Sequence, residues 1–285
     1  MAELLKGKEA AAALNEDTAK WVEELKITGI EPCLAILRVG ERPDDISYEN
    51  GAVKRCEAVG ASVKKAVLPA DVSKEVFYRT LEDLNQDPSV HGILMFRPLP
   101  KELDNERARN SILPEKDIDG CSDVSLAGIF TGKDLGFAPC TAEAAIAILD
   151  HYGVELSGKR IVVIGRSLVV GRPLAMMLLN RNATVTICHT RTKDIPSVTK
   201  EADIIFTSMG SPETLDAAYV REGQTVVDIS ICWNEAKGKL CGDCRFEEVE
   251  PIVDKITPVP GGVGAVTTSV LVRHLVQAAD RKRNV

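Results

Sequence analysis

The stretch 161–192 has the residue types and spacing of a phosphate-binding turn. The β-branched run Ile161 to Ile164 is typical of a strand buried on both faces of a parallel sheet. Gly165 ends that strand, Gly171 permits a close backbone approach, and Pro173 falls where the first turn of a helix tolerates proline. A helical period and then a strand period follow. The stretch therefore predicts a βαβ unit whose helix N-terminus points its amides at a phosphate.

The turn departs from the usual dinucleotide fingerprint, G-x-G-x-x-G with an acid about 20 residues later. Residues 165–173 read G-R-S-x-x-V-G-x-P, and the second strand ends in residues 188–191 (CHTR) without an acid. An acid would repel a 2′-phosphate, whereas Arg166 and Arg191 can pair with one. The pattern favours NADP over NAD, although the glycines alone suit a plain βα turn of another α/β protein equally well.

Two loops and the cysteines form a second group of candidates. Residues 258–264 (PVPGGVG) make a proline- and glycine-rich loop of a length that is rarely a mere linker in a compact domain. Residues 116–120 (KDIDG) form an acidic cluster. The eight cysteines are scattered, mostly in apolar segments, which suits reduced thiols. The C-x-x-C pair Cys241 and Cys244 has no second pair or nearby histidine, so we interpret it as structural and predict no metal site.

Strands and helices alternate along the chain, which predicts an α/β protein. From Lys101 to Pro139 the pattern becomes loop-like. Thr141 is expected to be the N-cap of the helix that joins the two halves, and Gly60 to close an earlier one. We expect helices at 3–25, 46–59, 73–84, 142–151 and 267–281, and strands at 32–39, 62–68, 92–96, 161–164, 183–187, 204–208 and 225–231.

Length and composition exclude several classes of protein. A chain of 285 residues exceeds the usual size of one domain, so two domains are expected. The net charge of -7 is spread along the chain and no basic stripe occurs, which argues against a nucleic-acid partner. Residues 1–17 do not resemble a signal peptide, and no apolar run reaches the roughly 20 residues of a membrane span. We expect a cytoplasmic protein that does not engage a membrane.

Five stretches, taken together and in order, carry a resemblance. They are Tyr48 after a G-x-x-P turn, 116–120 (KDIDG), 139–141 (PCT), the turn at 165–173 and the loop at 258–264. Each is weak alone, but the five in register cover essentially the whole chain. The sequence resembles the methylenetetrahydrofolate dehydrogenase/cyclohydrolase (FolD) family.

The resemblance implies a two-domain α/β architecture with a cleft between the domains. The N-terminal α/β catalytic domain would comprise 1–138 and be completed by the C-terminal helix, 267–285. A Rossmann-like domain with a parallel sheet, 139–266, would bind NADP. The substrate would be a folate, and family members are usually homodimers.

The resemblance also assigns residues. Tyr48 would stack on the folate ring system and Asp119 would hold its pterin end, both as catalytic and substrate-binding residues, while Pro260 and Gly261 would line the folate site. The cofactor contacts would map onto Gly165, Arg166, Ser167, Thr190 and Ile231. Without the shared register, the preferred interpretation is structural for all three: Tyr48 as a core aromatic, Asp119 as a turn residue and Thr190 as a strand end.

The sequence departs from the family at the reacting centre. The family places a lysine four residues after the tyrosine, on the same helical face, where this chain has Ala52. Lys54 is six residues from Tyr48 and points elsewhere on a helix. The family's glutamine in the third strand, which bonds that lysine, is replaced by Phe96, and Arg97 follows. Two lesser departures are Ser230, where glycine is usual, and Ala265, where proline is common.

These departures should affect one reaction more than the other. Oxidation of 5,10-methylenetetrahydrofolate to the methenyl cation removes a hydride and no proton, so it chiefly requires positioning. Hydrolysis of the methenyl cation requires proton transfer, and a suitable group is worth roughly 100-fold to 10,000-fold. We therefore expect an NADP-linked dehydrogenase with weak or absent cyclohydrolase activity. Two alternatives remain: a dehydrogenase of the same fold with another pterin or one-carbon substrate, and a non-catalytic folate- or nucleotide-binding protein.

Overall fold

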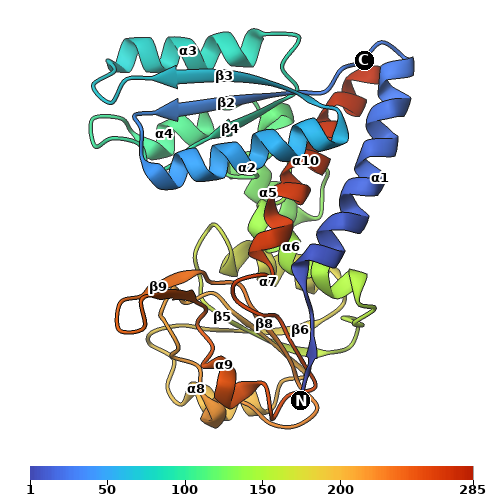
Figure 1. Cartoon of the computed structure of the whole chain (residues 1–285), viewed down its shortest axis with the longest axis vertical. Helices are drawn as coiled ribbons and strands as arrows, with labels where there is room; N and C mark the ends of the chain where they lie inside the picture. The colour runs from blue at the N-terminus through green and yellow to red at the C-terminus, as the bar shows by residue number, and fades with distance from the viewer. Residues whose placement is uncertain (285) are drawn as a thin grey trace. The chain divides into compact units, whose positions relative to one another are not determined.

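The computed structural model describes residues 1–284, and its internal contacts divide them into two units (Figure 1). Unit 1 comprises Met1–Ala12 and Thr141–Thr267, and unit 2 comprises Ala13–Cys140 and the chain from Thr268 onward. The expected domain boundaries stay a prediction. Contacts group the first twelve residues with unit 1, although the sequence assigned them to the catalytic domain.

Unit 1 is built on a six-stranded parallel sheet in which strands that are distant in sequence lie side by side. Two of its central strands, 204–207 and 225–228, are buried along their whole length, and a third is buried from Ile161 to Ile164, as its β-branched run predicts. The sheet order is β1 (Glu3–Leu4), β11 (Lys255–Ile256), β8 (Thr225–Asp228), β7 (Ile204–Thr207), β5 (Arg160–Ile164) and β6 (Thr184–Cys188).

Short helices and one hairpin complete unit 1. Apolar side chains beneath the sheet, among them Ile205, Leu215 and Val249, form a buried core. The hairpin is antiparallel and lies outside the main sheet. These elements are α6 (Cys140–His151), α7 (Gly171–Asn180), α8 (Ile195–Lys200), the 3₁₀ turn η2 (Ala217–Tyr219), β9 (Cys232–Asn234), β10 (Lys239–Cys241) and α9 (Phe246–Val249).

Unit 2 is built on a three-stranded parallel sheet, β3-β2-β4, which runs beside its helices in Figure 1. Phe77 and Leu81 pack on one face with Ala35 and Leu37, because alternate residues of a strand face the same side. The elements are α1 (Gly7–Ile27), β2 (Cys33–Val39), α2 (Pro43–Val59), β3 (Ser62–Leu68), α3 (Lys74–Gln86), β4 (Gly92–Met95), α4 (Asn105–Asn110), η1 (Pro114–Lys116), α5 (Asp123–Thr131), α10 (Gly264–Arg281) and η3 (Lys282–Asn284), and both α1 and α10 also contribute residues to unit 1.

A buried ion cluster ties α2 to the opposite face of the unit 2 sheet. Glu49 of α2 is 4% exposed and accepts from Arg38 Nε of β2 at 2.8 Å. Lys65 Nζ of β3 lies 2.8 Å from the other oxygen of Glu49. Burial alone would raise the pKa of Glu49, but the hydrogen bonds and charges of Lys65 and Arg38 lower it. The carboxylate therefore fixes the helix that carries Tyr48 onto two strands.

Most predicted elements are confirmed, and four expectations were wrong. Glu3 and Leu4 form a strand rather than the first turn of a helix, since they pair with β11. The loop-like stretch after Lys101 holds α4 and α5, whose N-caps Asp104 and Ser122 were overlooked. Strand β8 ends at Asp228 rather than at position 231. The sixth helix begins at Cys140, so Thr141 lies inside it and is not its N-cap.

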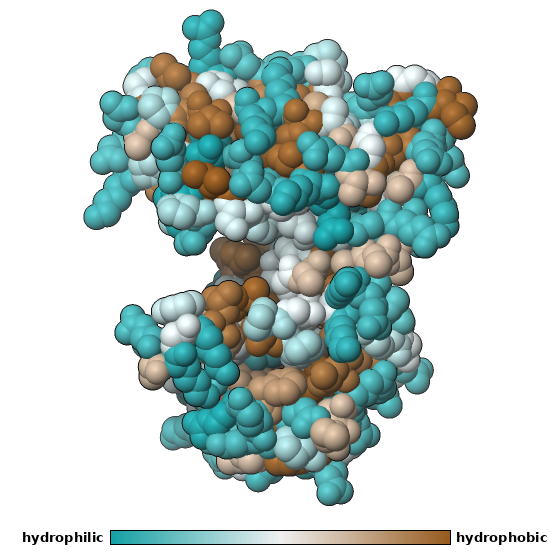
Figure 2. All heavy atoms as spheres, in the orientation of Figure 1, coloured by the Kyte–Doolittle hydropathy of each residue, from teal (hydrophilic) through white to brown (hydrophobic). Residues whose placement is uncertain are grey.

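The outer surface seen in Figure 2 is mainly hydrophilic, with hydrophobic residues interspersed. Among the described residues, no helix has the length and apolar character needed to cross a membrane. The most exposed apolar side chains of the β9–β10 hairpin region are Ile231 and Trp233, at 55% and 59%.

The Glu49 cluster yields a stability prediction. Replacement E49Q leaves the buried guanidinium of Arg38 without its counter-charge, and should lower the free energy of unfolding at pH 7 by about 3 kcal/mol. Because the folded-state pKa of Glu49 is lowered, its contribution is present above its unfolded pKa and is lost as the pH falls below about 4.5. Urea unfolding at pH 7 and pH 4 measures both effects. E57Q, on the exposed side of the same helix, is the control. Equal effects of the two variants would contradict the prediction.

Candidate active site

The turn between β5 and α7 has the close backbone packing that a phosphate-binding turn needs. Gly165 has φ +129°, and a Cβ there would lie 2.4 Å from Ser208 Oγ. A Cβ on Gly171 would lie 2.2 Å from the Gly165 carbonyl. Both positions therefore require glycine. Ser167 Oγ accepts from Val170 N–H at 3.0 Å, and Arg166 and Ser167 are exposed. Val170, the N-cap of α7, gives the helix no side-chain hydrogen bond, and Arg172 N–H donates to the Ser167 carbonyl at 3.0 Å.

The other predicted cofactor residues end neighbouring strands of the same sheet. Thr190 follows β6, which pairs with β5, and Ile231 follows β8, which is joined to β5 through β7. The chain turns to opposite sides of β5 at β6 and β7, and such a reversal is where nucleotides bind in open α/β sheets. The topology thus brings Gly165, Arg166, Ser167 and Thr190 to one edge, with exposed Ile231 along it.

Ser230, one of the departures, belongs to a hydrogen-bonded cluster around Asp243. The buried Asp243 carboxylate accepts from Ser230 Oγ at 2.7 Å and from Thr207 Oγ1 at 2.7 Å. It also accepts from the backbone N–H groups of Met209 and Ser211. Ser230 Oγ in turn accepts from Gly210 N–H at 3.1 Å. A glycine at position 230 would lack these bonds, so the serine fastens the loops after β7 and β8 together.

Beside Ser230, Asp228 is a second buried carboxylate. Its oxygens accept from the backbone N–H groups of Asp243 and Cys244, at 3.2 and 2.7 Å. Burial raises its pKa to about 6, against these hydrogen bonds. The sequence analysis assigned no role to Asp228 or Asp243. The position of Asp228, an acid at the end of a buried strand, could have indicated a carboxylate that binds neighbouring backbone N–H groups.

Pro260 and Gly261 lie in an exposed loop of unit 1 that begins after β11. The Gly261 carbonyl accepts from Gly7 N–H at 2.8 Å, which ties the loop to the start of α1. Ala265, where proline is common in the family, donates its N–H to the Gly262 carbonyl at 3.0 Å. Proline could not make that bond, so this departure adds a contact within the loop.

In unit 2, Tyr48 and Phe96 come together. Tyr48 lies in the second turn of α2, and Phe96 directly follows β4. Their rings meet edge to face with centroids 5.8 Å apart, a favoured aromatic geometry. Phe96 is 9% exposed and Tyr48 is half-buried. Burial, together with the charges of Asp119 and Cys140, raises the pKa of Tyr48, so the phenol stays protonated.

Asp119 lies near both. Its Oδ2 is 3.9 Å from Arg97 Nη2, and the two side chains are 28% and 25% exposed. Burial raises the pKa of Asp119 to about 6; the nearby Asp117 raises it as well, whereas Arg97, Cys140 and His274 lower it. Cys140 and His274 are buried neighbours that the sequence analysis did not assign. Their contact at 3.7 Å joins residues 134 positions apart, and no local sequence signal could have indicated it.

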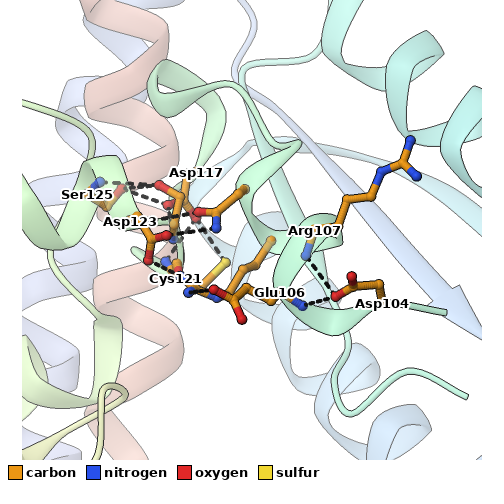
Figure 3. A network of polar contacts seen from close by, with 10 residues as sticks. Asp104, Glu106, Arg107, Asp117, Cys121, Asp123 and Ser125 are labelled. Atoms are coloured by element: carbon orange, nitrogen blue, oxygen red, sulfur yellow. Dashed lines mark hydrogen bonds and ion pairs between the residues drawn. The ribbon is translucent and has the colours of Figure 1, made fainter. Parts of the chain in front are cut away.

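The loop that presents Asp119 is anchored by Asp117 (Figure 3). The fully buried Asp117 carboxylate accepts from the N–H groups of Cys121 and Ser122 at 3.0 and 2.7 Å, and from Ser125 Oγ at 2.6 Å. Ser122 also caps α5 by accepting from Ser125 N–H. The acidic cluster predicted at 116–120 thus splits into two roles: Asp117 orders the turn, and Asp119 remains half-exposed.

The position of the expected lysine holds no ionisable group. Ala52, four residues after Tyr48, is fully buried. Lys54 is exposed on α2, as its six-residue spacing from Tyr48 predicts. Within residues 1–284 the structure has no cluster of His, Cys, Asp or Glu that could hold a metal ion. The described cysteines form no disulfide, and Cys241 and Cys244 are buried.

Comparison with known proteins decides the family. Residues 5–119 match the model of the tetrahydrofolate dehydrogenase/cyclohydrolase catalytic domain, and residues 139–283 match its NAD(P)-binding domain. The chain belongs to the tetrahydrofolate dehydrogenase/cyclohydrolase family. Among curated relatives, the "Bifunctional protein FolD" of Carboxydothermus hydrogenoformans is 48% identical over 281 residues, covering 98% of each chain.

Solved structures of this family share the fold over the full chain. The bifunctional FolD enzyme of Campylobacter jejuni is 38% identical with a TM-score of 0.95, and the match covers 99% of this chain and 100% of that one. The Trypanosoma brucei enzyme, solved with NADP cofactor and an inhibitor, is 32% identical with a TM-score of 0.92, covering 100% and 99%. The family resemblance and the α/β architecture with a Rossmann-like C-terminal domain are confirmed.

The Asp117 anchor can be tested by denaturation. D117A leaves buried donors of Cys121, Ser122 and Ser125 without an acceptor, and should lower the free energy of unfolding by about 3 kcal/mol. D123A is the control, because the Asp123 side chain is 59% exposed and should cost no more than about 1 kcal/mol. Urea unfolding at pH 7 compares them. A loss in D117A no greater than in D123A would refute the anchoring role.

Proposed function

We propose that this chain oxidises 5,10-methylenetetrahydrofolate to 5,10-methenyltetrahydrofolate with NADP, and that its cyclohydrolase activity is weak or absent. One observation supports the weak or absent cyclohydrolase activity. Tyr48 lies close to Asp119, but the residue four positions after Tyr48 on α2 is the buried Ala52, and Phe96 replaces the expected glutamine. Membership of a folate dehydrogenase/cyclohydrolase family, whose relatives include an NADP complex, supports the first half.

The nucleotide edge of unit 1 suits NADP. Gly165 and Gly171 let a pyrophosphate approach the backbone at the N-terminus of α7, where the helix dipole favours its charge. Exposed Arg166 and Arg191 supply cations for a 2′-phosphate, and Thr190 directly precedes Arg191. Bound there, NADP supplies the hydride acceptor.

The folate-side roles follow from the chemistry of each group. The half-buried Tyr48 ring is the aromatic face on which the folate ring system stacks. Its phenol keeps its proton because burial raises its pKa. Asp119, ionised above pH 6, accepts hydrogen bonds from the pterin. Pro260 and Gly261 lie on an exposed loop of unit 1, as residues that line a substrate site must.

Oxidation requires little of these side chains beyond position. The methylene carbon gives up a hydride while a ring nitrogen lone pair forms the C=N bond, and no proton leaves. Holding the methylene carbon against the hydride acceptor in the reactive geometry is by itself worth many powers of ten in rate. Tyr48, Asp119 and the NADP edge can therefore support this step without the lysine.

Hydrolysis of the methenyl product is different. Water must lose a proton as it attacks, and a ring nitrogen must gain one as the carbon–nitrogen bond breaks. Ala52 and Phe96 can do neither. Arg97 stays charged at any working pH and is a poor proton carrier. Lys54 is exposed on α2.

A second candidate is a dehydrogenase of the same fold with another pterin or one-carbon substrate. The Phe96–Tyr48 contact and the Arg97–Asp119 pair give these candidate substrate residues a different shape and charge from the family pattern, which favours altered specificity. A protein without catalysis is less well supported, because the glycine geometry of the β5–α7 turn is intact.

We propose further that the protein works as a cytoplasmic homodimer. Its free thiols fit a reducing compartment. Exposed Trp233 and Leu240 on the β9–β10 hairpin are apolar surface of the kind that an interface covers.

The proposal is tested by following NADPH and the methenyl species as separate signals. With 5,10-methylenetetrahydrofolate and NADP, we expect NADPH to form and the methenyl species to decay no faster than it does without protein. Rapid enzymatic clearance that persists in K54A would contradict the argument from Ala52. Absence of NADPH would transfer support to the altered-substrate candidate.

The double variant A52K/F96Q tests the cause of the loss. Restoring the polar pair should raise methenyl hydrolysis at least about 10-fold over the parent protein. A52K alone is the matched control, since its lysine would lack the glutamine partner. A folded double variant, checked by circular dichroism, with unchanged hydrolysis would show that other residues limit this reaction.

The pKa of Asp119 predicts a pH dependence. Because burial raises it to about 6, the carboxylate becomes protonated below that pH and loses its acceptor role. The kcat/KM of the dehydrogenase should then fall about 10-fold per pH unit below pH 6. D119N should lower kcat/KM at pH 7.5 and abolish the fall of kcat/KM below pH 6. D123N should leave the value at pH 7.5 and the acidic side of the pH profile unchanged. A limb centred near pH 4 in the parent protein would be inconsistent with the role of Asp119.

A further inference from the structure

Arg97 has hydrogen-bonding capacity that its protein surroundings do not use. Its Nε is buried and has no hydrogen-bond partner among the described residues. Its Nη2 lies 3.9 Å from Asp119 Oδ2, close enough for charge attraction but beyond hydrogen-bond distance. A buried donor left unpaired is costly, so an arginine in this state is suited to meet an acceptor brought by a ligand.

The surroundings of Arg97 narrow the kind of ligand. The preceding residue, Phe96, offers no acceptor and packs against Tyr48, so the polar pair Arg97–Asp119 borders an aromatic surface. A flat heterocycle fits the aromatic part. A carboxylate and a guanidinium side by side fit a ring edge on which hydrogen-bond donors lie next to an acceptor.

The edge of a 2-amino-4-oxopteridine has this order: the 2-amino group and N3–H are donors, and the neighbouring C4 carbonyl is an acceptor. We propose that Arg97 is a specificity-determining residue that donates to the C4 carbonyl of the substrate, while Asp119 accepts from the 2-amino and N3–H groups. This inference rests on the proposed folate substrate and adds to it: Arg97 makes the site selective for the 4-oxo ring.

The 4-amino analogue of the substrate, compared in the parent protein and in an Arg97 variant, tests this contact. Replacing the C4 oxygen by an amino group presents a donor to a guanidinium that can only donate. It also turns N3–H, the partner proposed for Asp119, into an acceptor, so the part due to Arg97 is read from the change in preference between the parent protein and R97M. The test measures binding of tetrahydrofolate and 4-amino-4-deoxytetrahydrofolate to the full-length protein by calorimetry. We expect the parent protein to prefer the 4-oxo ligand by about 10- to 100-fold.

R97M, which keeps most of the aliphatic stem of the side chain and removes its donors, should reduce that preference by about 10-fold. It should also raise KM for the folate substrate more than it lowers kcat. R79M is the matched control, because it removes the same charge from an exposed position on α3 of the same unit, and it should keep the preference of the parent protein.

The outcomes separate this inference from the proposed function. If R97M and the parent protein show the same ratio of affinities, the assignment of Arg97 is wrong while the folate site stands. An equal weakening of both ligands in R97M would indicate a structural role or a contact with another part of the folate, and would also overturn it. If the parent protein binds neither ligand, both the assignment and the proposed folate substrate fail.

Discussion

Parallel strand pairing is the constraint on which the rest of this structure depends. In a parallel sheet every strand ends at the same edge, so residues that are far apart in sequence meet wherever their strands are neighbours. In unit 1 this brings the turn after β5 beside the segments after β6 and β7. In unit 2 it brings Phe96 and Arg97, after β4, to the edge at which β2 leads into the helix of Tyr48. Both candidate sites are formed by side chains that lie at these edges of the two sheets.

The residues at the unit 2 edge divide into those that hold a molecule and those that would move protons. Tyr48, Asp119 and Arg97 offer a ring, an acceptor and donors. Ala52 and Phe96 offer only bulk and apolar surface. A reaction that depends on position can survive such a change, whereas one that depends on proton transfer cannot. The loss of a lysine and of its glutamine partner together is also physically consistent, because either alone would leave a polar group without its bond.

The sequence was sufficient for much of the fold and for the location of the sites. Strong periodicity located β2, β3 and β5 to within a residue, and glycine and proline positions identified the β5–α7 turn. The edge strand β1 could not be predicted from two residues, because its pairing with β11 is purely tertiary. The same holds for contacts between distant residues, such as Cys140 with His274 and Arg97 with Asp119. Helices α4 and α5 were missed for a different reason: they are short, and their capping residues were the only local signal.

The Asp243 cluster affects how much of the free energy of nucleotide binding is entropic. One buried carboxylate accepts hydrogen bonds from Thr207, the last residue of β7, and from the segments after β7 and β8. Loops that are already ordered lose little conformational freedom when a cofactor arrives. A protein that selects its cofactor with a rigid edge can release it quickly, since neither capture nor departure has to wait for a loop to fold.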